Sequence, residues 1–353
     1  MKKQGLLKYI GIVMAAGVLL AGCGSSDKNA EVEKGMQAIE AMDYETAMNS
    51  FSKAEELKEN PRLIARGRGI ACMGQTDYEK AVEYFLECMA LSNGVVEDMD
   101  YDVNFYLAAS YQKLKKYQEA IAVYDAILGM HSGDTDAYYL RGNAYLSLGK
   151  YEEAKLDFDQ VIKREPYNYN RLIQIYEVLR AAGYKDMGDE YLRAALSEKE
   201  KKMNDYEKGR IQFYLEDFKG AQVSLEQAKA EKGAEADVYL YLGMAYEATG
   251  DYNYAITNVY NAYLSQKEGT AALYNQLGLC YLKQEQYDAA LEAFQSAMQI
   301  PDNGMMQTLK FNEIVAYEYL NEFEQATILL DNYLKIYPDD EQAKREYGFL
   351  STR

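Results

Sequence analysis

The 353-residue chain contains no tryptophan, four prolines, four cysteines and one histidine. Because proline interrupts helices, its scarcity, together with abundant Ala, Tyr, Leu, Glu and Lys, predicts a nearly all-helical protein. One histidine and four scattered cysteines leave too few side chains for a zinc site or a histidine-based catalytic pair. The sequence also shows no glycine-rich phosphate loop and no nucleophile elbow. We therefore expect neither an enzyme nor a protein that carries a metal or cofactor.

Positive charge is scarce relative to negative charge. The chain has 38 Lys and Arg against 56 Asp and Glu, which gives a formal net charge of −18. A surface this acidic repels phosphate backbones, so we expect no nucleic-acid partner. The hydrophobic fraction of 48% is nevertheless that of a packed chain rather than a disordered one.

The first 22 residues have the pattern of an export signal. Three lysines accompany an uncharged apolar run over residues 9–20, which is too short to span a membrane comfortably. The run ends in Leu20-Ala21-Gly22-Cys23, which resembles the bacterial lipobox. That resemblance implies that residues 1–22 are a signal peptide, that Cys23 is lipidated, and that residues 23–28 form the anchor and a short linker. A plain secretory signal and an uncleaved anchor are the alternatives.

A period of about 34 residues runs through the rest of the chain. A segment of the type Tyr-x-x-Ala recurs nine times at steps of 33 to 39 residues, ending at Ala47, Ala81, Ala120, Ala154, Gly188, Ala221, Ala255, Ala290 and Ala326. Twelve residues earlier most copies have a small residue, at Gly35, Gly69, Ala108, Gly142, Gly209, Gly243 and Gly278. Four residues later every copy has a large apolar one, at Phe51, Phe85, Tyr124, Phe158, Leu192, Leu225, Val259, Phe294 and Leu330.

These offsets indicate pairs of antiparallel helices. Small residues let two helix backbones approach closely, and the large residues fill the space between neighbouring pairs. We expect Val259 to occupy the large position of repeat seven, and Ala262 to be its next small packing residue. Repeat five departs from the pattern, because Tyr176 stands at its small position and Gly188 replaces the alanine. We expect looser packing there.

The pattern resembles the tetratricopeptide repeat family over roughly residues 28–340. The resemblance implies an all-α fold, a right-handed α-solenoid of about nine helix-turn-helix units over residues 29–340. Residues 341–353 are predicted to form a capping helix, with Ala343, Tyr347 and Phe349 available to cover the last repeat. Cys72 and Cys88 fall at packing positions of repeat two, where they are either buried thiols or a disulfide.

The resemblance also implies where a partner would bind. In this family the first helix of each repeat lines a concave surface, and a mixture of rings, Arg and Asn suits a protein or peptide partner. The positions of this chain that match the concave surface are Arg66, Phe105, Tyr139, Asn143, Arg180, Tyr206, Arg210, Phe213, Tyr214, Met244, Glu247 and Asn275. Any one of them could instead pack between repeats.

The sequence therefore predicts a scaffold that is anchored by lipid to the extracytoplasmic face of a cell membrane. Its partner would be a protein or peptide in envelope or surface assembly. The alternative is a binder of an extracellular peptide or glycan, used for sensing or uptake. Whether the membrane is that of a Gram-positive cell or an outer membrane stays open.

Overall fold

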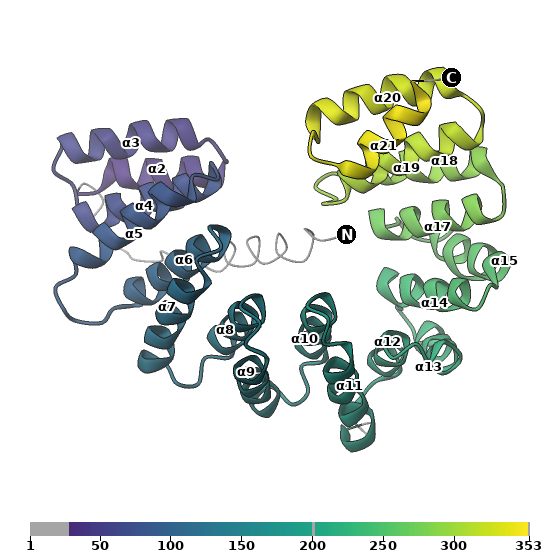
Figure 1. The fold of residues 1–353 in the computed structure, drawn as a ribbon, viewed down its shortest axis with the longest axis horizontal. Coiled ribbons are helices and arrows are strands. Elements are labelled where there is room, and N and C mark those ends of the chain that lie inside the picture. Colours follow the sequence, from purple (N-terminus) through teal and green to yellow (C-terminus); the bar gives the residue numbers. More distant parts are fainter. Residues whose placement is uncertain (1–27, 200–201, 352–353) are drawn as a thin grey trace. The chain divides into compact units, whose positions relative to one another are not determined.

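A computed structural model describes residues 28–199 and 202–351. Within these residues the regular structure consists of helices alone, which confirms the predicted all-α fold (Figure 1). None of the described helices combines the length and the apolar character that a membrane-spanning helix needs. The predicted signal peptide, Cys23 and the linker up to residue 27 lie outside the described residues.

The described residues form nine consecutive helix pairs and one further helix, α21 (Glu341–Leu350). Each pair corresponds to one predicted repeat. The pairs are α2 (Ala30–Glu40) and α3 (Tyr44–Glu56), α4 (Pro61–Gly74) and α5 (Tyr78–Ala90), α6 (Asp98–Lys113) and α7 (Tyr117–Met130), α8 (Thr135–Ser147) and α9 (Tyr151–Arg164), α10 (Tyr169–Ala181) and α11 (Lys185–Lys199), α12 (Asp205–Tyr214) and α13 (Phe218–Ala230), α14 (Ala236–Ala248) and the continuous segment α15 (Tyr252–Tyr254), η2 (Ala255–Tyr260) and α16 (Asn261–Leu264), α17 (Ala271–Lys283) and α18 (Tyr287–Met298), and α19 (Met306–Tyr319) and α20 (Phe323–Ile336).

The chain divides into two compact units, which we call unit 1 (up to Tyr191) and unit 2 (from Leu192). Within unit 1 the first helix of a pair contacts the first helix of the next pair, as α2 does with α4, α4 with α6, and α8 with α10. Unit 2 repeats this arrangement in α12, α14 and α17. Each unit is therefore a stack of helix pairs in which every pair is held mainly by its neighbours.

Glycines on the first helices leave space for large side chains of the second helices. A Cβ atom at Gly142 would lie 2.7 Å from the Phe158 ring, and one at Gly278 would lie 2.5 Å from the Phe294 ring. Both phenylalanines are completely buried. The predicted pairing of small with large residues is thus confirmed here, and it recurs in the pairs Gly35 with Phe51, Gly69 with Phe85, and Gly209 with Leu225.

In repeat five the large residue lies on the first helix and the glycine on the second. Tyr176 on α10 is completely buried, and a Cβ atom at Gly188 on α11 would lie 2.8 Å from its ring. A large residue on the first helix and a glycine on the second therefore fill the space that a glycine and a phenylalanine fill elsewhere. The expectation of looser packing in repeat five is wrong because the two departures from the pattern compensate each other.

Repeat seven departs from the predicted register of its second helix. Residues Ala255–Tyr260 form a π-helix, whose turn takes up more residues than an α-helical turn. A Cβ atom at Gly243 would consequently meet the ring of Tyr260, at 2.1 Å, and not Val259. Further along, Tyr263 is buried whereas Ala262 is only half-buried. The expected roles of Val259 and Ala262 are therefore wrong by one residue, which is a rotation of about 100° around the helix.

Helix α21 covers the last pair, as expected, but with different side chains. Ala343 and Leu350 are buried in one cluster with Leu330 and Tyr333 of α20. Phe349 and also Tyr347 are exposed, at 42% and 38%. Of the three residues expected to cover the last repeat, Ala343 alone is buried, and Leu350 is buried in the same cluster.

The cysteines of repeat two are thiols in the structure. Cys72 and Cys88 are both buried and free, and so is Cys280 of α17. Burial raises the pKa of the Cys72 and Cys88 thiols, which lowers their reactivity because the thiolate is the nucleophile. The sequence allowed either buried thiols or a disulfide between Cys72 and Cys88, and the structure has the buried thiols.

Candidate functional site

The candidate residues on α12 form one cluster with a tyrosine of α14. The centroid of the Tyr241 ring lies 6.3 Å from that of Tyr206, 5.7 Å from that of Phe213 and 6.1 Å from that of Tyr214. The hydroxyl oxygens of Tyr214 and Tyr241 are 3.2 Å apart, which is within hydrogen-bond distance. All four rings are half-buried, so each keeps part of its surface open to solvent. We call these four residues and Arg210 the α12–α14 cluster.

Arg210 lies between two rings of this cluster. Its guanidinium carbon is 5.1 Å from the centroid of the Tyr206 ring and 5.2 Å from that of the Tyr241 ring. Both contacts are favourable because the face of an aromatic ring attracts a cation. Half-buried tyrosines around an arginine are the residue types that contribute most to binding at protein interfaces. The composition of the cluster therefore suits contact with another protein or a peptide.

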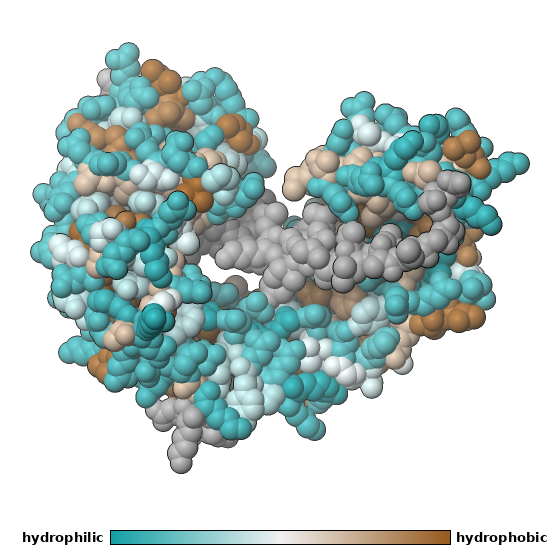
Figure 2. All heavy atoms as spheres, turned by 180° about the vertical axis from the view of Figure 1, so that it is seen from behind, coloured by the Kyte–Doolittle hydropathy of each residue, from teal (hydrophilic) through white to brown (hydrophobic). Residues whose placement is uncertain are grey.

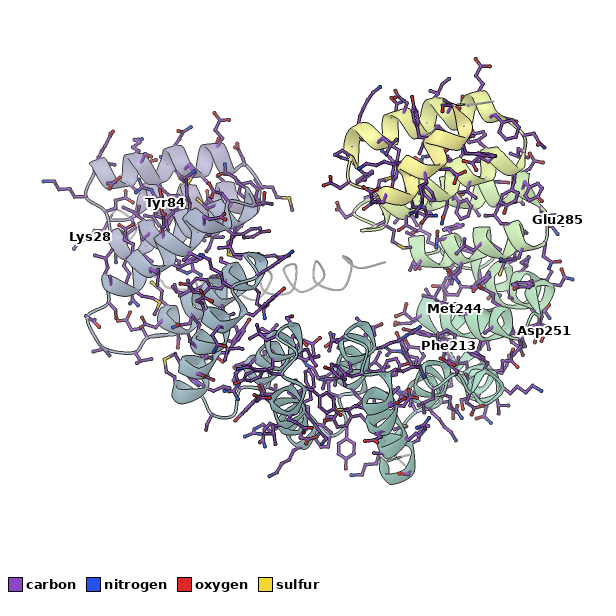
Figure 3. The ribbon with its side chains drawn as sticks, in the orientation of Figure 1. Lys28, Tyr84, Phe213, Met244, Asp251 and Glu285 are labelled. Atoms are coloured by element: carbon purple, nitrogen blue, oxygen red, sulfur yellow. The ribbon has the colours of Figure 1, made fainter. Side chains whose placement is uncertain are left out.

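The helices of the cluster are seen in Figure 3. Phe213 and Met244 lie on the neighbouring helices α12 and α14, whereas Asp251 and Glu285 lie away from them at the turns that follow α14 and α17. Figure 2 shows that hydrophilic residues cover most of the visible surface and that the hydrophobic ones are scattered among them. The half-buried rings on α12 and α14 are a candidate site because they surround Arg210.

Two other candidate residues of unit 2 point into the interior. The Glu247 carboxylate accepts hydrogen bonds from the Tyr260 hydroxyl and, at 3.0 Å, from Nε2 of Gln276. Asn275 is only 5% exposed, and its Oδ1 atom accepts a hydrogen bond of 2.8 Å from Asn312. Both groups connect neighbouring helices, so the prediction that they face a partner is corrected. Met244 is half-buried.

In unit 1 three candidate residues pack between helices. Tyr139 is 1% exposed, and its ring centroid lies 6.2 Å from that of Phe158, so its assignment to a binding surface is corrected. Arg66 is half-buried and forms an ion pair of 3.3 Å with Asp102 of the next repeat. The half-buried Phe105 ring contacts Tyr101 on the same helix and Tyr124 on α7.

Asn143 and Arg180 are the other two candidates in unit 1. Asn143 on α8 is half-buried, and its Oδ1 atom is buried without a hydrogen-bond donor among the described residues. Arg180 is exposed in the last turn of α10. The side chain of Arg180 thus keeps access to solvent, but the structure brings it into no cluster like that of unit 2.

The predicted binding residues do not include Tyr241, which is the centre of the cluster. Mapping α14 by the phase of the repeat selected Met244 and Glu247 but gave no reason to select Tyr241. A signal was nevertheless present, because Tyr241 stands three residues before Met244 and therefore on the same helix face. The spacing of Tyr206, Arg210 and Phe213, by four and three residues, correctly indicated a shared face of α12.

Glu247 makes the stability of unit 2 depend on pH. Burial raises the pKa of the Glu247 carboxyl, and hydrogen bonds from Tyr260, Cys280 and Gln276 offset only part of that rise. Between the two pKa values the folded protein keeps a proton that the unfolded chain has lost. The stability that Glu247 contributes is therefore fully present below the usual pKa of 4.5 and is lost as the pH rises through the raised pKa. Glu247→Gln is expected to remove this loss and to raise the melting temperature at neutral pH. Thermal unfolding of both proteins as a function of pH measures the effect, and identical pH profiles would contradict it.

Comparisons with known proteins agree with the observed helix pairs. Sequence models of the tetratricopeptide repeat match residues 102–132, 135–168, 206–272 and 271–300. The chain is 22% identical over 289 residues to anaphase-promoting complex subunit 3 of Schizosaccharomyces pombe, a match that covers 63% of this chain and 43% of that protein. It is 25% identical over 158 residues to the peptidyl-prolyl cis-trans isomerase FKBP4 of Mus musculus, covering 41% of this chain and 34% of the isomerase. The chain thus spans less than half the length of these curated relatives.

Among solved structures, yeast Tom70 has a similar fold. The two chains superpose with a TM-score of 0.52 over 93% of this chain and 89% of the yeast protein, at 14% sequence identity. An identity this low supports the fold alone. The nine helix pairs, the recurring contact of glycine with a large apolar residue and the matching sequence models lead to one assignment. The chain belongs to the tetratricopeptide repeat family.

Proposed function

We propose that the protein is a lipid-anchored scaffold on the extracytoplasmic face of a cell membrane. In this proposal it binds a protein or peptide partner through the α12–α14 cluster and serves envelope or surface assembly. Tetratricopeptide-repeat proteins generally mediate protein–protein interactions, and this chain has repeats along its length. The observation that carries the binding part of the proposal is the group of half-buried rings around Arg210.

The sequence of the first 23 residues supports the anchor. A lipidated Cys23 would be joined to α2, which begins at Ala30, by only six residues. A fully extended chain spans at most about 3.6 Å per residue, so this linker would keep the first repeat within roughly 25 Å of the membrane. Two or three acyl chains on one cysteine would suffice for stable attachment.

Cys23→Ala is the direct test of the anchor. Without the thiol no thioether-linked lipid forms, so we expect the variant to be either uncleaved or released from the membrane fraction. Cell fractionation and metabolic labelling with a fatty acid measure both effects. Fractionation and labelling like those of the parent would show that Cys23 is not lipidated, and this outcome would leave the binding part of the proposal intact.

Removing two side chains of the α12–α14 cluster tests the binding surface. Once a partner has been identified by crosslinking on intact cells, Arg210→Ala combined with Phe213→Ala is expected to weaken its binding by about 2–4 kcal/mol, the range for anchor residues at interfaces. Val223→Ala is the matched control, because Val223 lies on α13 and is 64% exposed. Titration calorimetry with purified proteins measures the binding.

The double variant also needs a measure of folding. Phe213 contacts Phe218 as well as Tyr241, so we expect some loss of stability in addition to the loss of binding. Binding is therefore measured well below the melting temperature, where circular dichroism shows full helix content. Unchanged binding by a folded double variant would exclude the α12–α14 cluster as the partner site.

The alternative function, binding of a small extracellular ligand, has one observation in its favour. A pocket of about 320 Å³ opens beside Tyr206, with Lys232 and Asp237 among its lining residues. The Tyr206 hydroxyl lies 3.5 Å from a carboxylate oxygen of Asp237. A clear rise in melting temperature with a free peptide or glycan, lost in Tyr206→Ala, would favour this alternative over the scaffold.

A further inference from the structure

In the second helix of repeat seven, the adjacent residues Val259 and Tyr260 could each fill the space beside Gly243 of the first helix. In five other repeats the residue four places after the conserved alanine packs against the glycine of the first helix. In repeat seven that residue is Val259, an apolar side chain that would fill the position as Leu225 does in repeat six. The π-helix places Tyr260 against Gly243 instead, while Val259 stays buried beside it.

Tyr260 is held by specific contacts on two helices. Gly243 on α14 leaves the space for its ring, because a Cβ atom there would lie 2.1 Å from the ring. The Tyr260 hydroxyl donates a hydrogen bond to Glu247, also on α14, and the second carboxylate oxygen of Glu247 accepts one from Gln276 of α17. One carboxylate therefore connects α14, the π-helix and α17. An ordinary α-helix over the same residues would turn Tyr260 by about 100° and break its contact with Glu247.

The π-helical segment is also in contact with both neighbouring repeats. The Lys229 side chain of α13, in repeat six, donates a hydrogen bond of 3.0 Å to the backbone carbonyl of Asn258. Asn261, which follows the π-helix, donates one of 3.1 Å to the Tyr281 hydroxyl in repeat eight. A change of register here would alter contacts with repeats six and eight together, which is how a local change spreads in a stack of repeats.

We propose that the second helix of repeat seven is a two-register element, in which the hydrogen bond from Tyr260 to Glu247 selects the π-helical register. In the other register the helix is regular, Val259 packs against Gly243, and Tyr260 is turned toward solvent. Isolated π-turns within α-helices are frequent at functional sites, in keeping with a segment that has two arrangements. The proposal concerns the interior of unit 2 and does not depend on the lipid anchor or on the α12–α14 cluster.

Two substitutions at Glu247 test the selection in the full chain. Glu247→Leu removes the hydrogen-bond acceptor, and we expect the helix to become regular, so that Tyr260 gains solvent exposure while the helix content stays the same. Glu247→Gln keeps an acceptor of the same shape and should leave Tyr260 buried. Hydroxyl-radical footprinting with residue-level mass spectrometry measures the exposure, and a several-fold faster modification of Tyr260 in Glu247→Leu alone is the expected result. Continued protection of Tyr260 in Glu247→Leu, or loss of helix content, would overturn the proposal.

A matched pair of single-residue deletions provides the second test. Thr257 and Glu292 are both exposed and both lie two places after the conserved alanine of their repeats. Deleting Thr257 brings Tyr260 to the fourth place in a regular helix, so the melting temperature should change by no more than about 4 °C. Deleting Glu292 moves Phe294 away from Gly278, so a loss of more than about 8 °C is expected. Equal losses in the two variants would show that repeat seven cannot take the regular register.

Discussion

Arg141→Met is expected to lower the free energy of unfolding of unit 1 by about 3–5 kcal/mol, the range for breaking a buried ion pair by removing one partner. Arg141 on α8 donates two hydrogen bonds to Asp157 of α9, at 2.9 Å from Nε and 2.6 Å from Nη2, and a third of 2.5 Å to Asp125 of α7. The side chain of Asp157 is only 4% exposed. Methionine fills most of the arginine volume but leaves the carboxylate buried without a cation. Urea unfolding of both proteins measures the difference.

A double variant separates the buried charge from the packing. Arg141→Met combined with Asp157→Leu removes both charges, and pairs replaced in this way by apolar residues are often as stable as the original. We therefore expect the double variant to recover most of the stability that Arg141→Met loses. A double variant that is less stable than the single one would show that Arg141 stabilises unit 1 through its contacts with the rings of Tyr138 and Tyr145 and not through Asp157.

Gly142→Leu is expected to cost about 3 kcal/mol, at the upper end of the range for overpacking a core. Even the Cβ atom of an alanine would come within 2.7 Å of the Phe158 ring, and that ring is completely buried against Tyr139. Because each repeat contacts mainly its neighbours, the loss of protection should be concentrated around α8 and α9. Native-state hydrogen exchange resolves this, and a uniform loss from residue 30 to residue 350 would contradict it.

Gly129 provides the control for this substitution. It lies in α7 of the same unit, and a Cβ atom there would meet nothing within 4 Å. Gly129→Leu should therefore be neutral or slightly stabilising, because glycine inside a helix is less favourable than other residues by about 0.5–1 kcal/mol. If Gly129→Leu and Gly142→Leu were equally harmful, the close approach of glycine to phenylalanine would not be what stabilises the repeats.

The fold followed from the sequence because its determinants repeat. Nine copies of the same small and large positions average out local irregularities, so the helix pairs were predicted correctly even in repeat five, where Tyr176 and Gly188 exchange sizes. The register of the second helix of repeat seven could not be predicted from the sequence. A single extra residue is hidden among steps of 33 to 39, yet it rotates all later side chains of the helix by about 100°.

The candidate site was harder to predict for the same geometric reason. A position assigned by helical phase can err by one residue, and that error decides whether a side chain faces solvent or the next helix. Tyr139 and Asn275 were placed on the surface by phase, whereas both are buried. The grouping on α12 was predictable because three of its residues share one helix face, but Tyr241 enters the cluster from α14 through tertiary packing, which no pattern within α12 encodes.

Crosslinking from defined positions on intact cells tests the central claim of a surface scaffold most directly. A photoreactive benzophenone side chain is introduced at Tyr214 in the α12–α14 cluster or, as the control, at the exposed Val223 on α13. The account predicts that the same protein partner is captured repeatedly from Tyr214 but not from Val223, and that capture at the cell surface is lost to the extent that Cys23→Ala releases the protein from the membrane fraction. Capture from Val223 alone, or no partner from either position in a correctly folded protein, would contradict it.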